Sequence, residues 1–225
     1  MGTFFHPGRA PSKALVTSGF NVLACAADRS SIAAMENPTR RLVFVIGPCG
    51  AGKSTTLRRM RAVLGHRVGE IAVLETDTFY MMIDPTWSEY TDERASITSL
   101  ITARTAAEFF KQGFDWVVVG SNGLQDRAQV EAFLTHIPAE IEVCHLFLDP
   151  SAAAVEQRIA ARDDPIDAHK TPRWLAENVA WMRGYHRPES ARIDNSELGV
   201  DQTVEAIYAA VTAGHGLVRA SCPAR

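Results

Sequence analysis

Apolar runs and helical periods alternate along the chain from residue 41 onward. Residues 41–47, RLVFVIG, carry Leu, Val, Phe, Val and Ile in succession without polar alternation, which is typical of a strand buried on both faces. Further strands are predicted at residues 71–76, 115–121, 142–149 and 191–196, and helices at residues 52–65, 91–112, 125–136, 151–162, 172–185 and 201–213. Strands separated by helical crossovers indicate an α/β fold, a three-layer α/β/α sandwich around a five-stranded parallel sheet.

Two of the predicted helices carry recognisable boundary residues. Gly65 is expected to end the first helix, since glycine is the usual residue after a helix. Thr171 and Pro172 form a favourable cap and first position for the helix at residues 172–185. One face of that helix is shared by four residues: Trp174, Asn178, Trp181 and Tyr185.

Length and composition predict one globular domain. The chain has 225 residues, of which 46% are hydrophobic and 22% charged. We expect a disordered leader at residues 1–36, the domain at 37–216 and a C-terminal tail at 217–225. The formal net charge of −3 gives no general reason to expect a nucleic-acid or membrane partner. Four widely spaced cysteines and no apolar run near the ~20 residues of a membrane span favour a cytoplasmic protein.

A glycine-rich stretch, GPCGAGKSTT at residues 47–56, lies directly after the first predicted strand and at the start of a helix. Gly47, Gly52, Lys53 and Ser54 fit G-x-x-x-x-G-K-[ST], a loop whose backbone N–H groups bind phosphates. Lys53 is expected to reach the β and γ phosphates, and the Ser54 hydroxyl to ligate magnesium. The loop therefore predicts a nucleoside triphosphate and Mg²⁺ as cofactors, and the leading hypothesis below takes the nucleotide to be ATP. The other expected loop contacts are Pro48, Cys49, Gly50, Ala51 and Thr55.

Two classes of protein that commonly carry such a loop also have further motifs, and this sequence does not match those motifs. A motor ATPase usually ends its third-position strand in acidic residues, but no carboxylate follows Val119 in VVVGSNG. A guanine-nucleotide switch carries Asn/Thr-Lys-x-Asp. The residues two positions after the four lysines are Leu, Thr, Gly and Pro, which excludes this motif at Lys13, Lys53, Lys111 and Lys170.

The chain resembles the P-loop small-molecule kinases, a superfamily that includes nucleoside monophosphate, shikimate, gluconate and antibiotic kinases. Four stretches carry the resemblance: GPCGAGKST, LETDTFY at 74–80, RIAAR at 158–162 and RIDNS at 192–196. The resemblance implies that Asp77 contacts the acceptor hydroxyl. It also implies that Arg158 lies near the adenine and that Arg162 touches phosphate, beside a mobile lid near residues 163–173. The loop after RIDNS is expected to border the base.

The resemblance assigns catalytic roles to Lys53, Asp77 and Arg162. Phosphoryl transfer spreads negative charge over the phosphate oxygens, so aligned cations and a dry site favour it. Asp77 would orient the acceptor hydroxyl and accept its proton. Simpler explanations stay open. Asp77 fits a cap for the next turn equally well, and Arg158 and Arg162 fit a solvated helix face paired with Glu156 or Asp163.

The resemblance also implies that the acceptor is covered by residues 79–94, FYMMIDPTWSEYTDER, which concentrate Phe79, Tyr80, Trp87 and Tyr90. Flat rings suit a sugar face, a base or an aromatic ring, although they also pack helices onto sheets. They suggest a largely uncharged, partly apolar acceptor. Three polar residues complete the predicted acceptor site: Arg94, Asn122 and Arg127.

The leading hypothesis is an ATP- and Mg²⁺-dependent kinase that phosphorylates a hydroxyl of a small molecule, such as a nucleoside-like natural product, an antibiotic or a sugar. A nucleoside monophosphate kinase is the nearest alternative, because it would grip its acceptor's phosphate with Arg94 and Arg127. A non-catalytic ATP-binding regulator is the alternative from another class. Nucleic-acid phosphorylation is less favoured, since the arginines are scattered and the net charge is negative.

Overall fold

The computed structural model describes residues 39–86, 91–124, 127–162, 170–185 and 190–219. The predicted leader, residues 163–169 of the predicted lid, and two of the predicted acceptor residues, Trp87 and Tyr90, lie outside these ranges. The description below concerns the compact unit that begins at Asn37.

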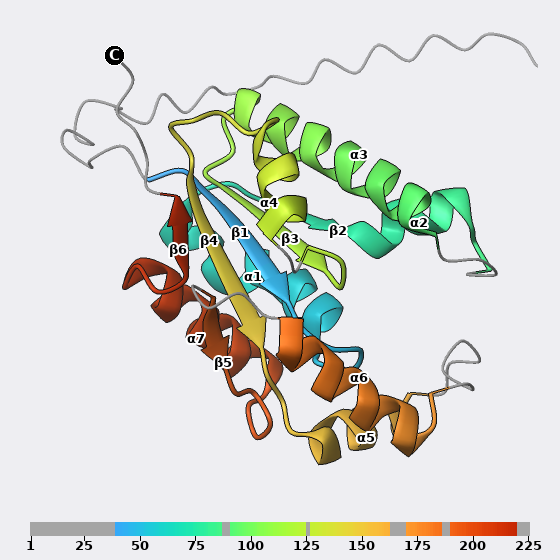
Figure 1. Cartoon of the computed structure of the whole chain (residues 1–225). Helices are drawn as coiled ribbons and strands as arrows, with labels where there is room; N and C mark the ends of the chain where they lie inside the picture. Colours follow the sequence, from blue (N-terminus) through green and yellow to red (C-terminus); the bar gives the residue numbers. More distant parts are fainter. Residues whose placement is uncertain (1–38, 87–90, 125–126, 163–169, 186–189, 220–225) are drawn as a thin grey trace, which may run out of the picture. The chain divides into compact units, whose positions relative to one another are not determined.

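Within the described residues, six strands form one sheet (Figure 1). They are β1 (Arg41–Ile46), β2 (Ile71–Glu75), β3 (Trp116–Ser121), β4 (Glu142–Leu148), β5 (Ala191–Ile193) and β6 (Leu217–Arg219). The first five run parallel in the order β2-β3-β1-β4-β5, which confirms the predicted parallel α/β sheet.

The sixth strand, β6, corrects the predicted count of five. The short strand β5 pairs only with Leu146–Leu148 of β4. The earlier part of β4 is therefore left open on that edge, and β6 pairs there antiparallel, opposite Val143 and Cys144. A stretch that was expected to begin a tail at residue 217 thus covers an exposed strand edge.

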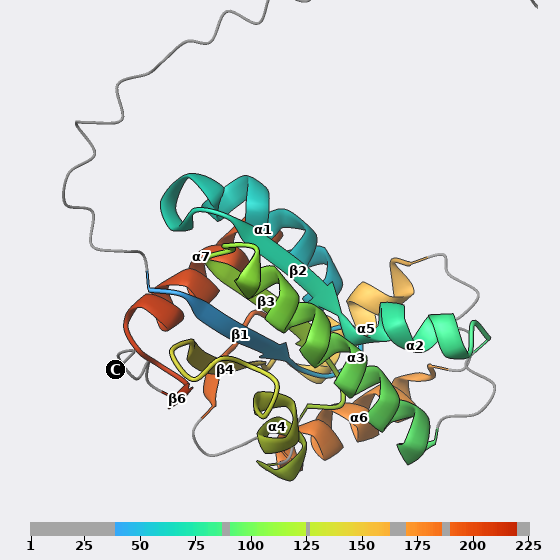
Figure 2. The ribbon, with the colours of Figure 1, turned by 90° about the horizontal axis from the view of Figure 1, so that it is seen from above.

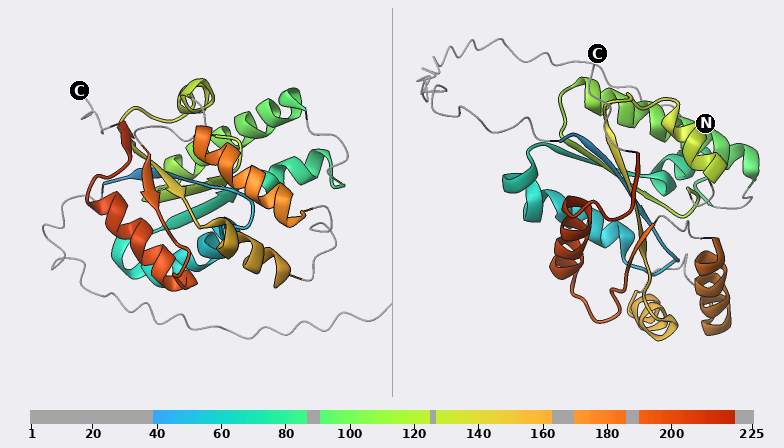
Figure 3. Two further views of the ribbon diagram at one scale, coloured as in Figure 1. Left: turned by 60° about the horizontal axis from the view of Figure 1, so that its bottom comes forward. Right: turned by 60° about the vertical axis from the view of Figure 1, so that its left-hand side comes forward.

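Helices cover both faces of the sheet (Figure 2). One face carries α1 (Lys53–Val68) and α7 (Val200–Thr212), and the other carries α3 (Asp92–Lys111) and α4 (Arg127–Leu134). Three further helices, α2 (Thr76–Ile83), α5 (Ala152–Ala160) and α6 (Pro172–Tyr185), lie toward the carboxyl ends of the strands, as the two views of Figure 3 also show.

Strand β1 divides its side chains between two apolar cores. Leu42, Phe44 and Ile46 pack in the core that includes α3 and α4 residues. Val43 and Val45 pack in the core that includes α1 and α7 residues. Both faces of the strand are therefore buried, which explains why its sequence shows no polar alternation.

Helix α1 runs beyond Gly65, where the sequence was expected to end it. The helix continues to Val68, and Gly69 follows at φ 81°. Leu64 and Val68 are buried one turn apart on the same face, so apolar contact carries the helix past the internal glycine. By contrast, the predicted cap of α6 is confirmed, since the Thr171 hydroxyl accepts the Trp174 N–H at 3.2 Å.

Helix α2 was not predicted from the sequence. It begins at Thr76, directly after β2, and spans eight residues. Asp77 therefore lies in the first turn of a helix rather than in a loop.

Candidate functional site

The glycine-rich loop between β1 and α1 adopts a conformation that its glycines permit. Gly50 and Gly52 have φ values of 77° and 90°, a region that other residues rarely occupy. A Cβ on Gly50 would lie 3.0 Å from Val155 and 3.1 Å from Ile159, so the loop also packs tightly on α5. The two glycines are thus required by backbone conformation and, at Gly50, by space.

The N-terminus of α1 is open to an anion. Gly52 caps the helix without a side-chain hydrogen bond, and no acidic residue lies in the first turn. The first backbone N–H groups and the positive end of the helix dipole favour phosphate here. Ser54 is half-buried in this turn and Thr55 is exposed.

Lys53 folds back over the loop. Its Nζ donates to the carbonyl oxygens of Gly47 at 2.8 Å and Pro48 at 3.0 Å. Burial lowers the pKa of the Lys53 ammonium, whereas the negative charge of Asp77 raises it and the positive charge of Arg162 lowers it. The structure therefore brings the three predicted catalytic residues into one electrostatic neighbourhood.

Asp77 is half-buried at the start of α2. Desolvation raises the pKa of its carboxyl group, and the negative charge of Glu75 raises it further. The positive charges of Lys53 and Lys170 lower the same pKa. Lys170 was not among the predicted site residues, and its place within the predicted lid near residues 163–173 was the available signal.

Arg158, predicted near the adenine, binds the backbone of the phosphate loop. Its guanidinium donates to the carbonyl of Ala51 at 3.3 Å and to the carbonyls of Asn195 and Ser196. The side chain of Asn195, which is 2% exposed, also donates from Nδ2 to Ala51 O, at 2.9 Å. The pair fastens the loop to the chain that follows β5. Asn195 was missed as a site residue, although it lies within the RIDNS motif.

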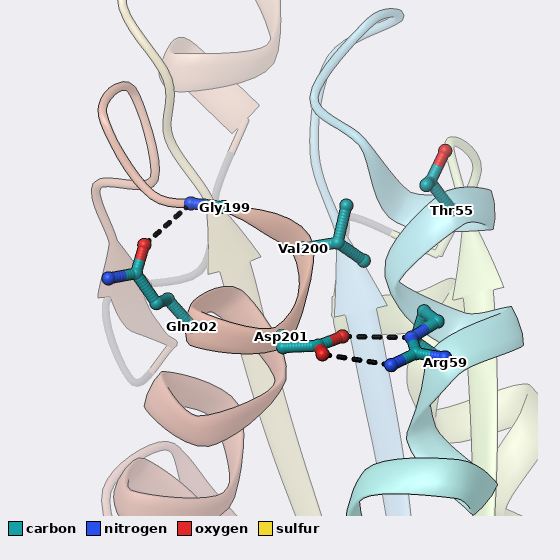
Figure 4. A pocket seen from close by; sticks show the side chains of 6 residues that line it. All are labelled: Thr55, Arg59, Gly199, Val200, Asp201 and Gln202. Atoms are coloured by element: carbon teal, nitrogen blue, oxygen red, sulfur yellow. Dashed lines mark hydrogen bonds and ion pairs between the residues drawn. The ribbon is translucent and has the colours of Figure 1, made fainter.

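A pocket of about 530 Å³ adjoins the phosphate loop, between the first turns of α1 and α7 (Figure 4). The bidentate ion pair of Arg59 with Asp201, at 2.8 Å for both bonds, joins the two helices beside it. The residues that line the pocket are Thr55, Arg59, Gly199, Val200, Asp201 and Gln202. It lies beyond the RIDNS motif, on the side where the resemblance predicts the base.

The two arginines expected at the acceptor are both held by carboxylates. Arg94 Nη1 lies 3.3 Å from an oxygen of Asp84, whose side chain is 6% exposed. Arg127 pairs with Glu131 one turn along α4, at 2.6 Å, and its side chain is 78% exposed. The structure therefore does not bring Arg127 into a buried site, and the pairing of Arg94 ties α3 to the end of α2.

The remaining predicted acceptor residues differ in exposure. Tyr80 is buried, with 3% of its surface exposed, and Phe79 is half-buried against the core on the α3 and α4 side, so Phe79 packs α2 onto that core. Asn122 follows β3, and its buried Oδ1 has no hydrogen-bond partner among the described residues. The neighbouring Ser121 hydroxyl accepts from Thr76 Oγ1 at 3.1 Å and from the Gly123 N–H at 2.9 Å. These bonds fix the turn that presents Asn122.

Among the described residues, no three His, Cys, Asp or Glu side chains group as a metal site. Ser54, the metal ligand that the loop motif predicts, is half-buried. Hard oxygen ligands and few protein contacts are what Mg²⁺ bound to a nucleotide requires. The loop, its lysine and the Ser54 hydroxyl fit magnesium-bound ATP. Over the same residues, no helix has the length and apolar character to cross a membrane.

A family model described as an AAA domain matches residues 42–187, more than half of the chain. The chain belongs to this family. The match begins in β1 and includes the phosphate loop, Asp77 and both arginines of RIAAR. No protein with a curated description matches the sequence.

Solved P-loop kinase structures share the fold. A sugar kinase from a Janibacter species has a TM-score of 0.54 at 19% identity, over 81% of this chain and 99% of its own. Shikimate kinase from Acinetobacter baumannii, in complex with shikimate, has a TM-score of 0.54 at 15% identity, over 79% of this chain and 96% of its own. The tunicamycin resistance protein of Deinococcus radiodurans has a TM-score of 0.53 at 16% identity, over 79% of this chain and 98% of its own. The expected resemblance to P-loop kinases is confirmed at the level of fold.

Proposed function

We propose that the protein transfers the terminal phosphate of ATP to a hydroxyl group of a small molecule. The observation that carries this proposal is the electrostatic interaction between Lys53, in the phosphate loop, and Asp77, in the first turn of α2 directly after β2. A cation for phosphate and a carboxylate for a hydroxyl proton are the two groups that transfer to an alcohol requires.

Each residue has a distinct role in this proposal. The loop amides and Lys53 hold the phosphates, and Ser54 holds the metal. Bound ATP would supply the phosphoryl group, and the bound magnesium ion would neutralise part of the charge on its phosphates. Asp77 orients the acceptor hydroxyl and takes its proton, while Arg162 adds positive charge near Lys53. Burial of Asp77 raises its pKa, which makes its carboxylate a better proton acceptor.

The nucleoside half of ATP is proposed to occupy the pocket between α1 and α7. Thr55 lines the pocket and directly follows the proposed metal ligand Ser54 in the sequence, so the pocket adjoins the phosphate site. Val200 offers an exposed apolar side chain there, and Thr55 and Gln202 offer polar groups. An apolar side chain among polar groups offers a base a surface to pack on and a ribose hydrogen-bond partners.

The acceptor is proposed to be an uncharged alcohol, for example a nucleoside-like natural product, an antibiotic or a sugar. Arg94 and Arg127 are engaged by carboxylates, which argues against their gripping a phosphate on the acceptor. Met81 follows Asp77 by one turn of α2 and is 46% exposed, so an apolar surface adjoins the carboxylate. The Oδ1 of Asn122, to which no described residue donates, suits an O–H donor of the acceptor.

Asp77→Asn tests the proposal. The variant should lower ATP-dependent phosphorylation of a hydroxylated acceptor by about 10²- to 10⁴-fold, because the amide cannot take the proton. Its dissociation constant for ATP, measured by calorimetry, should stay within about threefold of the original. The matched control is Asp92→Asn, at an exposed position in the first turn of α3. Equal turnover in Asp77→Asn and the original protein would refute the role of Asp77.

A further inference from the structure

Helix α6 makes a direct contact with the phosphate loop. The backbone N–H of Cys49 donates to Asn178 Oδ1 at 3.0 Å, across 129 positions of sequence. Asn178 is half-buried and lies in the middle of α6. The Cys49 N–H is thus bound by a side chain from the C-terminal third of the chain.

Apolar packing holds Asn178 against the loop. Val155 and Ile159 of α5 form a buried cluster with Leu175 and Val179 of α6. Two partly buried side chains pack against this cluster, Cys49 and Trp174. The Cys49 side chain thus rests on the two helices while its N–H binds one of them, so that α5 and α6 support the outer side of the loop.

Hydrogen bonds fix two peptide groups of the loop, one on each side of Gly50. Asn178 holds the N–H of Cys49, and Arg158 and Asn195 hold the carbonyl of Ala51. Peptide planes are rigid, so fixing these two groups restricts the rotation of the Gly50 peptides between them. Loop N–H groups can bind phosphate oxygens only when they point inward together.

We propose that Asn178 is a positioning residue for the phosphates, which acts through the Cys49 peptide and does not itself touch the nucleotide. The inference rests on the proposed function, because it assumes that the loop binds a polyphosphate. Without the amide oxygen, the half-buried Cys49 N–H loses its partner, and the peptide turns to find another. The loop then spends less time in its binding conformation, and affinity falls in proportion.

The test compares Asn178→Leu with the original full-length protein, using inorganic tripolyphosphate and ATP as separate probes in calorimetry with Mg²⁺. The lost bond should raise the dissociation constants of both probes by about three- to tenfold. The neighbouring Glu177→Gln serves as the control, since Glu177 is exposed and pairs only with Arg173 in the described contacts, at 2.8 Å. It should leave both constants unchanged.

Amide hydrogen exchange supplies a second readout that a general loss of stability does not imitate. In Asn178→Leu, exchange at Cys49 should accelerate, while exchange at Thr56, whose N–H donates to Gly52 O at 2.9 Å, should not. If folded Asn178→Leu binds tripolyphosphate as tightly as the original protein, the inference is wrong. If the original protein binds neither probe, the proposed function fails instead.

Discussion

The charges of Lys53 and Asp77 control each other. Burial lowers the pKa of the Lys53 ammonium and raises that of the Asp77 carboxyl, and the attraction between them opposes both shifts. Because the pKa of Asp77 is raised, its carboxylate becomes protonated, as the pH falls, at a higher pH than an ordinary aspartate does. Because the carboxylate is the proposed proton acceptor, the acid limb of the pH–activity profile should lie in that raised range.

Lys53→Met should raise the pKa of Asp77 further, because Lys53 is the largest influence that lowers it. Lys170→Met should act in the same direction with a smaller shift, since Lys170 is a weaker influence. Lys111→Met, at an exposed lysine paired with Glu108, is the control and should leave Asp77 unchanged. Carbon-detected NMR titration of the Asp77 carboxyl in the nucleotide-free protein measures this pKa in all three variants. A lowered pKa in Lys53→Met would contradict the account.

At the scale of elements, apolar runs and cap residues predicted most of the fold. The strand at residues 41–47 is found at Arg41–Ile46, and Thr171 caps α6 as expected. The strand predicted at residues 191–196 ends early, at Ile193, because Asp194 turns back to accept from the N–H and hydroxyl of Ser196. Helix α2 and strand β6 were missed, since short elements take their stability from tertiary packing more than from local pattern.

The pocket between α1 and α7 gives a prediction at this scale. Val200→Ser should weaken ATP binding by about two- to fivefold, because the side chain loses apolar contact with the nucleoside. Tripolyphosphate binding should not change, since the loop is intact. Leu217→Ser, at a similarly exposed apolar position in β6, is the matched control (39% exposed, against 37% for Val200). Equal losses for ATP and tripolyphosphate would place the nucleoside elsewhere.

In the whole molecule, the sheet order brings distant residues to one edge. β1 lies between β3 and β4, so the phosphate loop after β1 meets chain that follows β4 and β5. The motif predicted Lys53 and the loop from local sequence alone. Asn178 and Asn195 were not predicted as site residues, because their contacts with the loop exist only once the strands are ordered. Arg94 is the opposite case. Its position in the sequence predicted a role at the acceptor, and the fold pairs it with Asp84.

The central claim is phosphoryl transfer from ATP to an uncharged alcohol. The most direct measurement is mass spectrometry of a library of neutral hydroxylated compounds after incubation with the full-length protein, ATP and Mg²⁺. The account predicts that at least one compound gains a single phosphate in step with ADP formation, and that Asp77→Asn lowers the rate of this gain by about 10²- to 10⁴-fold. ADP accompanied only by free phosphate, at the same rate in both proteins, would contradict it.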